Sequence, residues 1–285
     1  MRPRLLLLVL LVIAAPARAQ LFAEPPPSAS AILADLPPGF YTEDAASGAT
    51  FDTPVAVAVA PDGRIFVAEK RGQVRIIQNG QKLATPFVNL EAEVLNNHDR
   101  GLLGITLDPE FETNRFVYLL YTVDHDGSGD YQRTDAFGRL VRYTASTSNP
   151  NVASLSSRRV LIGETFSSGI PACYLSHAPG TLDFGSDGTL FVGTGDGASY
   201  SHTDAGGIYN NCFGSGRLDP VENIGSFRSL YLGSLAGKIL RVDPATGLGL
   251  PTNPFYTGDP ADNESRVWAY GLRNPYRFAA LGDGS

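Results

Sequence analysis

The chain has 285 residues, with 22 Lys plus Arg against 29 Asp plus Glu, 31 glycines and 20 prolines. The acidic balance excludes the basic surface by which proteins bind nucleic acid. The many glycines and prolines, together with valines and aromatic residues, favour a turn-rich β protein over a helical one.

Residues 1–19 are typical of a secretory signal peptide. Arg2 and Arg4 precede an apolar run over residues 5–15, and residues 17–19 match a small-x-small cleavage site. The run is short for a bilayer span, and an uncleaved membrane anchor is the alternative. We therefore expect a periplasmic or extracellular protein that keeps no membrane span after cleavage.

Residues 20–38 are predicted to be a proline-rich linker, and residues 39–285 repeat one strand-turn-strand phrase. An apolar strand leads to Asp-Gly at three places, with a proline eight positions before each aspartate, and at the first two places a second apolar strand follows. These prolines are Pro54, Pro179 and Pro275. A closing strand that begins with glycine also recurs, at residues 72–76, 138–143 and 237–242.

Such repeated antiparallel units predict an all-β fold, a β-propeller of four-stranded blades. A sandwich or barrel with similar hairpins is the alternative.

The last copy of the phrase, residues 276–281, stops at its turn. We therefore expect a fragment of a longer protein, poorly soluble and inactive by itself.

Two short features bear on disulfides and metals. Cys173 and Cys212 are the only cysteines, and an oxidising compartment favours a disulfide between them over two free thiols.

The loop over residues 124–135 places oxygen-bearing residues as an EF-hand does, but it joins strands and lacks the final glutamate. We therefore predict no metal ligands among these residues.

The best candidate for chemistry is a histidine and an aspartate on neighbouring strand ends. His177 precedes one predicted strand and Asp196 follows the next, across the Asp187-Gly188 turn. In an antiparallel pair these positions share one end of the sheet, where a carboxylate fixes the imidazole tautomer as suits a general base. The spacing alone fits equally well an exposed turn histidine and a turn-capping aspartate.

Two further loops open at the same strand end. Arg273 and Asn274 follow an aromatic strand, and the guanidinium there could stabilise an oxyanion or form a structural ion pair. His98, Asp99 and Arg100 begin another blade and either line a polar pocket or are merely solvated.

Six phrases in this order resemble the glucose/sorbosone dehydrogenase family, which includes soluble sugar dehydrogenases that use pyrroloquinoline quinone (PQQ). They are RGLLGITLDPEF from Arg100, HAPGTLDFGSDG from His177, GTGDG from Gly193, LAGKILRVD from Leu235, NPF from Asn253 and GLRNPYRF from Gly271. The resemblance runs from about Leu36 to the end of the chain.

The resemblance implies a six-bladed propeller, here its first half, and a PQQ-dependent enzyme that oxidises an aldose-type sugar at the anomeric carbon and passes electrons to an acceptor. It implies that His177 is the base, that Asp196 orients it, and that Arg273 and Asn274 contact the quinone. Asp99 falls near a substrate-contacting position. The main Ca²⁺ ligands of the family are expected beyond residue 285.

The sequence departs from the family at two points. Ala178-Pro179-Gly180 replaces the Asn-Gly-Gly that often follows the histidine, and the segment that completes the quinone site in the family is not in this sequence. A recognition propeller without catalysis is therefore the alternative function. A propeller lactonase would need a carboxylate-rich metal centre, and the blade openings show no such cluster.

Overall fold

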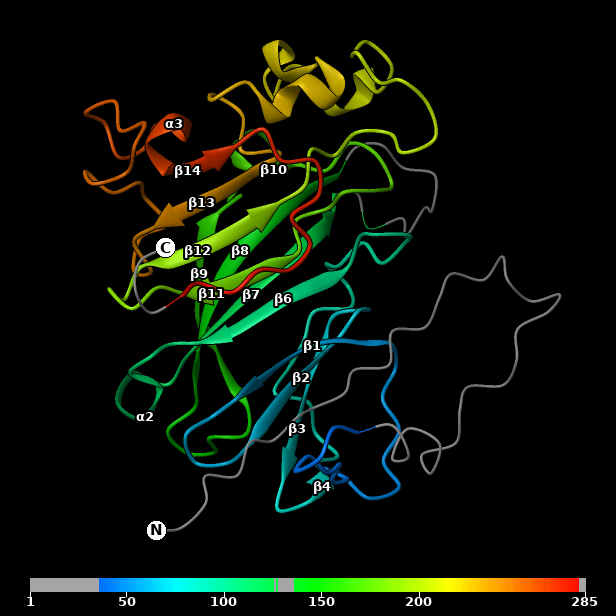
Figure 1. The fold of residues 1–285 in the computed structure, drawn as a ribbon, viewed down its shortest axis with the longest axis vertical. Coiled ribbons are helices and arrows are strands. Elements are labelled where there is room, and N and C mark those ends of the chain that lie inside the picture. Colours follow the sequence, from blue (N-terminus) through cyan, green and yellow to red (C-terminus); the bar gives the residue numbers. More distant parts are fainter. Residues whose placement is uncertain (1–35, 126, 128–135, 282–285) are drawn as a thin grey trace, which may run out of the picture.

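The structure, a computed structural model, describes residues 36–125, 127 and 136–281. Three antiparallel sheets follow one another along the chain (Figure 1). In this described part no helix is both long and apolar enough to cross a membrane. The predicted signal peptide and most of the predicted linker lie outside it.

The first sheet has the order β1-β2-β3-β4, with β5 also paired to β3. Its strands are β1 Pro54–Val59, β2 Ile65–Glu69, β3 Gln73–Gln78, β4 Gln81–Lys82 and β5 Val88–Asn89. The predicted Asp-Gly turn joins β1 to β2: the Asp62 carboxylate accepts the Arg64 amide proton, and Gly63 has a φ of 87° that suits glycine.

The second sheet has the order β10-β8-β7-β6, with β9 also paired to β8. Its elements are β6 Leu102–Leu107, α2 Phe111–Asn114, β7 Phe116–Asp124, β8 Ala136–Ala145, β9 Ala153–Ile162, η1 Phe166–Ser168 and β10 Ile170–Pro171. In the first and second sheets two strands share the outer edge, where the sequence predicts one.

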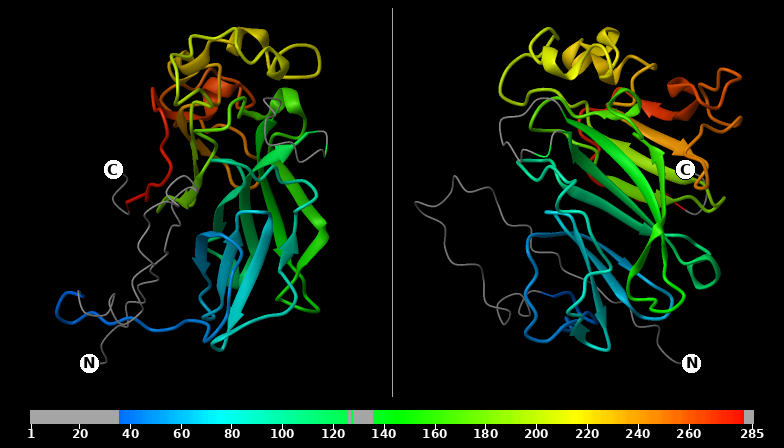
Figure 2. Two further views of the ribbon diagram at one scale, coloured as in Figure 1. Left: turned by 90° about the vertical axis from the view of Figure 1, so that its right-hand side faces the viewer. Right: turned by 180° about the vertical axis from the view of Figure 1, so that it is seen from behind.

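The third sheet has the order β11-β12-β13-β14. Its elements are β11 Thr181–Phe184, β12 Leu190–Thr194, η2 Asn210–Cys212, η3 Pro220–Glu222, η4 Gly225–Ser229, β13 Lys238–Val242, α3 Asn263–Arg266 and β14 Val267–Tyr270. The three predicted closing strands are β3, β8 and β13, each the third strand of its sheet. We call residues 195–237, which leave β12 and return to β13, the excursion; it lies at one end of the molecule (Figures 1 and 2).

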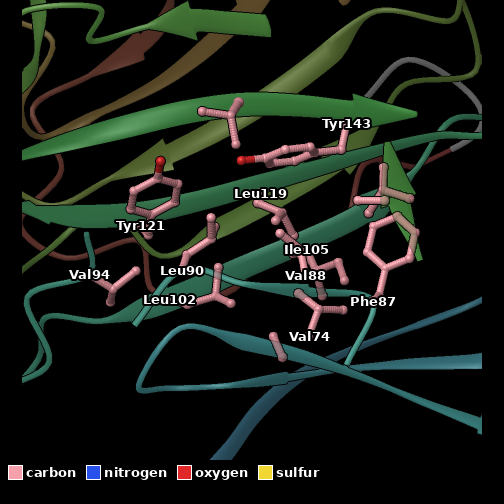
Figure 3. Close-up of a cluster of buried hydrophobic side chains, with 14 of the residues drawn as sticks. Val74, Phe87, Val88, Leu90, Val94, Leu102, Ile105, Leu119, Tyr121 and Tyr143 are labelled. Carbon is pink, nitrogen blue, oxygen red and sulfur yellow. The ribbon is translucent and has the colours of Figure 1, made fainter. Parts of the chain in front are cut away.

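The sheets pack face to face as blades do. β6 contacts both β1 and β11, so the first strands of the three sheets lie next to one another. One apolar cluster fills the space between the first and second sheets, where Phe66 meets Phe87 and Phe111 edge to face (Figure 3 shows part of this cluster). A second cluster joins the second and third sheets. The described residues therefore form three blades of a β-propeller, which confirms the predicted fold class.

The predicted strand over residues 276–281 is not a strand in the described part of the chain. Its polar groups bond outside any β ladder: the Ala280 amide donates to the Asp183 carboxylate, and the Arg277 guanidinium donates to the carbonyls of Val55 and Leu103. An apolar run becomes a strand only where a neighbouring backbone offers a ladder, and no described strand pairs with this segment.

Candidate active site

His177 and Asp196, which the sequence predicts to meet at one end of the third sheet, do meet there. Thr181 of β11 pairs with Gly193 of β12, so the residue before one strand and the residue after the other share one end of the sheet. There His177 Nδ1 lies 2.7 Å from Asp196 Oδ1, and both side chains are buried, 4% and 3% exposed. In a neutral imidazole, a carboxylate at this position accepts the proton on Nδ1 and leaves the lone pair on Nε2.

Glycines allow this close approach. A Cβ on Gly195 would lie 2.1 Å from the His177 carbonyl oxygen, so no larger residue fits without moving the backbone. The Gly197 amide donates to the same carbonyl, and the Ala198 amide donates to Asp196 Oδ1. His177 itself has a φ of 58°, a strained conformation that the surrounding contacts must hold.

Asp99 reaches His177 from the neighbouring blade. Its Oδ2 accepts the His177 amide proton at 3.0 Å, and its own amide donates to the Leu175 carbonyl. The residue is exposed, as is His98. Arg100 is fully buried and its Nε donates to Asn97 Oδ1, so the prediction that it lines a polar pocket or is solvated is wrong, because burial takes it off the surface.

Arg273 and Asn274 follow β14 and are exposed at the same end of the sheet. The Asp196 amide donates to the Arg273 carbonyl at 2.9 Å, so the backbones of Asp196 and Arg273 are held together. The guanidinium and the amide are donors that suit a quinone bearing carboxylates, and their exposure leaves them accessible. These two residues therefore fit the role of holding PQQ.

The predicted disulfide is present. Cys173 and Cys212 are bonded, with their Cα atoms 5.7 Å apart. The bond fastens the excursion to the loop that leads to His177, four residues further along the chain. Tyr174, next to the disulfide, packs against Tyr209 with ring centroids 5.0 Å apart.

Metal ligands do not gather in the described ranges. No group of three or more His, Cys, Asp or Glu residues there could hold a metal ion. Most of the calcium-like loop lies outside the described residues.

A buried charged cluster of Glu222, Arg228 and Lys238, which the sequence does not predict, contacts the His177–Asp196 pair, hereafter the dyad, through Arg228. Lys238 Nζ donates to the carbonyls of Arg228 and Ala236, while burial lowers its pKa to about 7. Burial raises the pKa of Glu222 to about 7 as well, and its Oε2 has no hydrogen-bond partner among the described residues. Two of the three lie in an excursion without periodicity, so no pattern in the sequence signals their burial.

Glu222 gives a testable pH dependence. A carboxyl whose pKa is raised on folding contributes stability below its ordinary pKa, and that contribution is lost as the pH rises through about 7. We therefore expect Glu222→Gln to raise the melting temperature at pH 8 relative to wild type, and the difference to shrink or reverse at pH 5. Thermal unfolding of both proteins across this range measures it, and a pH-independent difference would contradict a raised pKa of the buried carboxyl.

Comparison with known proteins decides the family. The family model described as Glucose / Sorbosone dehydrogenase matches residues 51–284. The chain belongs to this family. The glucose/sorbosone dehydrogenase match covers all three blades and every candidate site residue.

The curated relatives include both a Hedgehog-interacting protein and an aldose sugar dehydrogenase. Human Hedgehog-interacting protein is 27% identical over 241 residues, which cover 79% of this chain and 30% of that protein. The aldose sugar dehydrogenase YliI of Escherichia coli is 25% identical over 232 residues, which cover 80% of this chain and 50% of that protein. The chain thus spans at most half the length of these two relatives.

Solved structures of sugar dehydrogenases share the fold. A Thermus thermophilus protein described as a putative glucose dehydrogenase superposes with a TM-score of 0.57 at 28% identity, over 82% of this chain and 55% of that one. The PQQ-bound aldose sugar dehydrogenase of Streptomyces coelicolor gives 0.56 at 24% identity, over 81% and 54%. The second likeness shows the fold alone.

Proposed function

We propose that the complete gene product is an exported, PQQ-dependent dehydrogenase that oxidises an aldose-type sugar at its anomeric carbon. The observation that carries the proposal is the buried hydrogen bond between His177 Nδ1 and Asp196 Oδ1, with the exposed side chains of Arg273 and Asn274 at the same end of the sheet. The family match and the sugar dehydrogenase relatives support it.

Residues of this chain account for proton transfer, sugar contact and cofactor binding in the proposed reaction. His177 Nε2 takes the proton of the anomeric hydroxyl, and Asp196 holds the ring in the required tautomer and stabilises the imidazolium that forms. Asp99 fixes the backbone of the base through one oxygen, and we propose that its second oxygen contacts the sugar. Arg273 and Asn274 hold PQQ, whose chemistry when bound is to accept the hydride from the anomeric carbon.

A recognition propeller is the second candidate function. Two observations favour it: the name of the Hedgehog-interacting relatives indicates a protein partner, and only 4% of the His177 side chain is exposed, as in a purely structural pair. On this account the dyad stabilises the loop and no proton is transferred.

Reconstitution separates the two functions. The complete gene product is mixed with PQQ and Ca²⁺, and reduction of an artificial dye is followed with a panel of aldoses. We expect sugar-dependent turnover that requires PQQ. A folded protein that neither binds PQQ nor reduces the dye with any aldose would contradict the dehydrogenase and leave the recognition function.

A further inference from the structure

Arg228 belongs to the buried cluster with Glu222 and Lys238, and its guanidinium donates hydrogen bonds to three backbone carbonyls. Its Nε donates to the Asp196 carbonyl at 3.1 Å, Nη2 donates to the Gly197 carbonyl at 3.0 Å, and Nη1 donates to the Glu222 carbonyl at 3.1 Å. The residue is 1% exposed. A buried arginine with all three nitrogens bonded is fixed in one geometry, because each lost bond would leave a buried carbonyl without a partner.

Two of the three carbonyls belong to the segment that orients the base. The Asp196 backbone is held on both sides, since its amide donates to the Arg273 carbonyl and its carbonyl accepts from Arg228. The direction of the Asp196 carboxylate follows from that backbone, and the carboxylate in turn sets the proton position on His177.

The helical turn that carries Arg228 is itself fixed to the neighbouring strands. Lys238 Nζ donates to the carbonyls of Arg228 and Ser229, and the Gly271 amide donates to the Ser229 carbonyl. Gly271 stands two residues before Arg273. The same turn therefore connects the loop of the orienting aspartate to the loop of the arginine proposed to hold PQQ.

We propose that Arg228 is a positioning residue for the base: from the last third of the excursion it holds the Asp196–Gly197 backbone at the start of the same segment, and so keeps His177 in the tautomer whose Nε2 accepts a proton. The part of the excursion beyond Asp196 thus also supports the site, through Arg228, although Arg228 is not proposed to touch the substrate. This inference rests on the proposed function for its kinetic consequence, and on geometry alone for the tautomer.

The test uses the complete gene product with histidines labelled with ¹⁵N. The signals of His177 are assigned from their loss in a His177→Gln variant. The variants compared are Arg228→Met, which removes all donors, Arg228→Lys, which keeps the charge, and Arg266→Met. Arg266 is the matched control, because it also donates to backbone carbonyls, of Gly247 and Ala261, at the far end of β13 from the dyad.

In wild type we expect the Nδ1-protonated tautomer of His177, with a hydrogen-bonded Nδ1 proton. Arg228→Met should give a mixture of tautomers and lower kcat by about 10²-fold with little change in KM, because the base is misplaced while the substrate contacts remain. Arg228→Lys should recover part of the tautomer and of kcat, and Arg266→Met should match wild type in both.

Folding defects and failure of the proposed function are distinguishable from failure of this inference. If Arg228→Met does not fold, Arg228→Lys decides, with a roughly tenfold loss of kcat expected. Wild-type tautomer and kcat in the folded Arg228 variants would overturn the inference. If wild type oxidises no aldose, the dehydrogenase proposal fails, whereas the tautomer in the Arg228 variants still shows whether the arginine positions the imidazole.

Discussion

Replacing His177 by alanine is expected to lower kcat for aldose oxidation by about 10²–10⁴-fold, the contribution of a positioned general base. Asp196→Asn should also lower kcat with little change in KM, because an amide in place of the carboxylate no longer fixes the Nδ1 proton. Steady-state kinetics of dye reduction in the complete, PQQ-loaded gene product measure both effects.

A second histidine provides the control for this prediction. His202 also forms a hydrogen bond through Nδ1, but to the Ser199 hydroxyl, and it is exposed. His202→Ala should therefore keep near wild-type turnover. Equal losses in both histidine variants, or full activity in His177→Ala, would contradict the role of the dyad.

Removing the disulfide with Cys173→Ser and Cys212→Ser together is expected to lower the free energy of unfolding by about 2–4 kcal/mol. The bond closes a loop of 39 residues in sequence separation, so its loss frees a large part of the unfolded chain. Because it fastens the excursion beside the His177 loop, turnover should also decrease. Denaturant unfolding with and without a reducing agent is the measurement.

The double variant supplies its own control. A reducing agent should destabilise wild type and leave the serine variant unchanged. Unaltered unfolding of both proteins under reduction would show that the bond contributes nothing to the native fold.

Local patterns predicted most of the fold. The first two Asp-Gly turns and the prolines before them mark the hairpins β1–β2 and β11–β12, and the glycine-led closing strands are β3, β8 and β13. Residues 276–281 show the limit of such patterns. They belong to the same repeated phrase, but strand formation depends on a pairing partner that local sequence does not encode.

In the candidate site, too, some residues could be predicted from the sequence and others could not. His177 and Asp196 were predictable because strand pairing places them at one sheet end. Arg228 was not, because its importance comes from reaching the carbonyls of Asp196 and Gly197, which are far away in sequence. Irregular segments such as the excursion carry no period from which burial can be deduced.

The most direct test of the central claim is a single turnover of the PQQ-loaded complete gene product with an aldose that carries deuterium at the anomeric carbon. If this carbon gives up hydride while His177 removes the hydroxyl proton, the deuterated sugar reacts more slowly than the ordinary sugar, and His177→Ala slows both. Equal rates for the two sugars, or no reaction with either, would contradict the account.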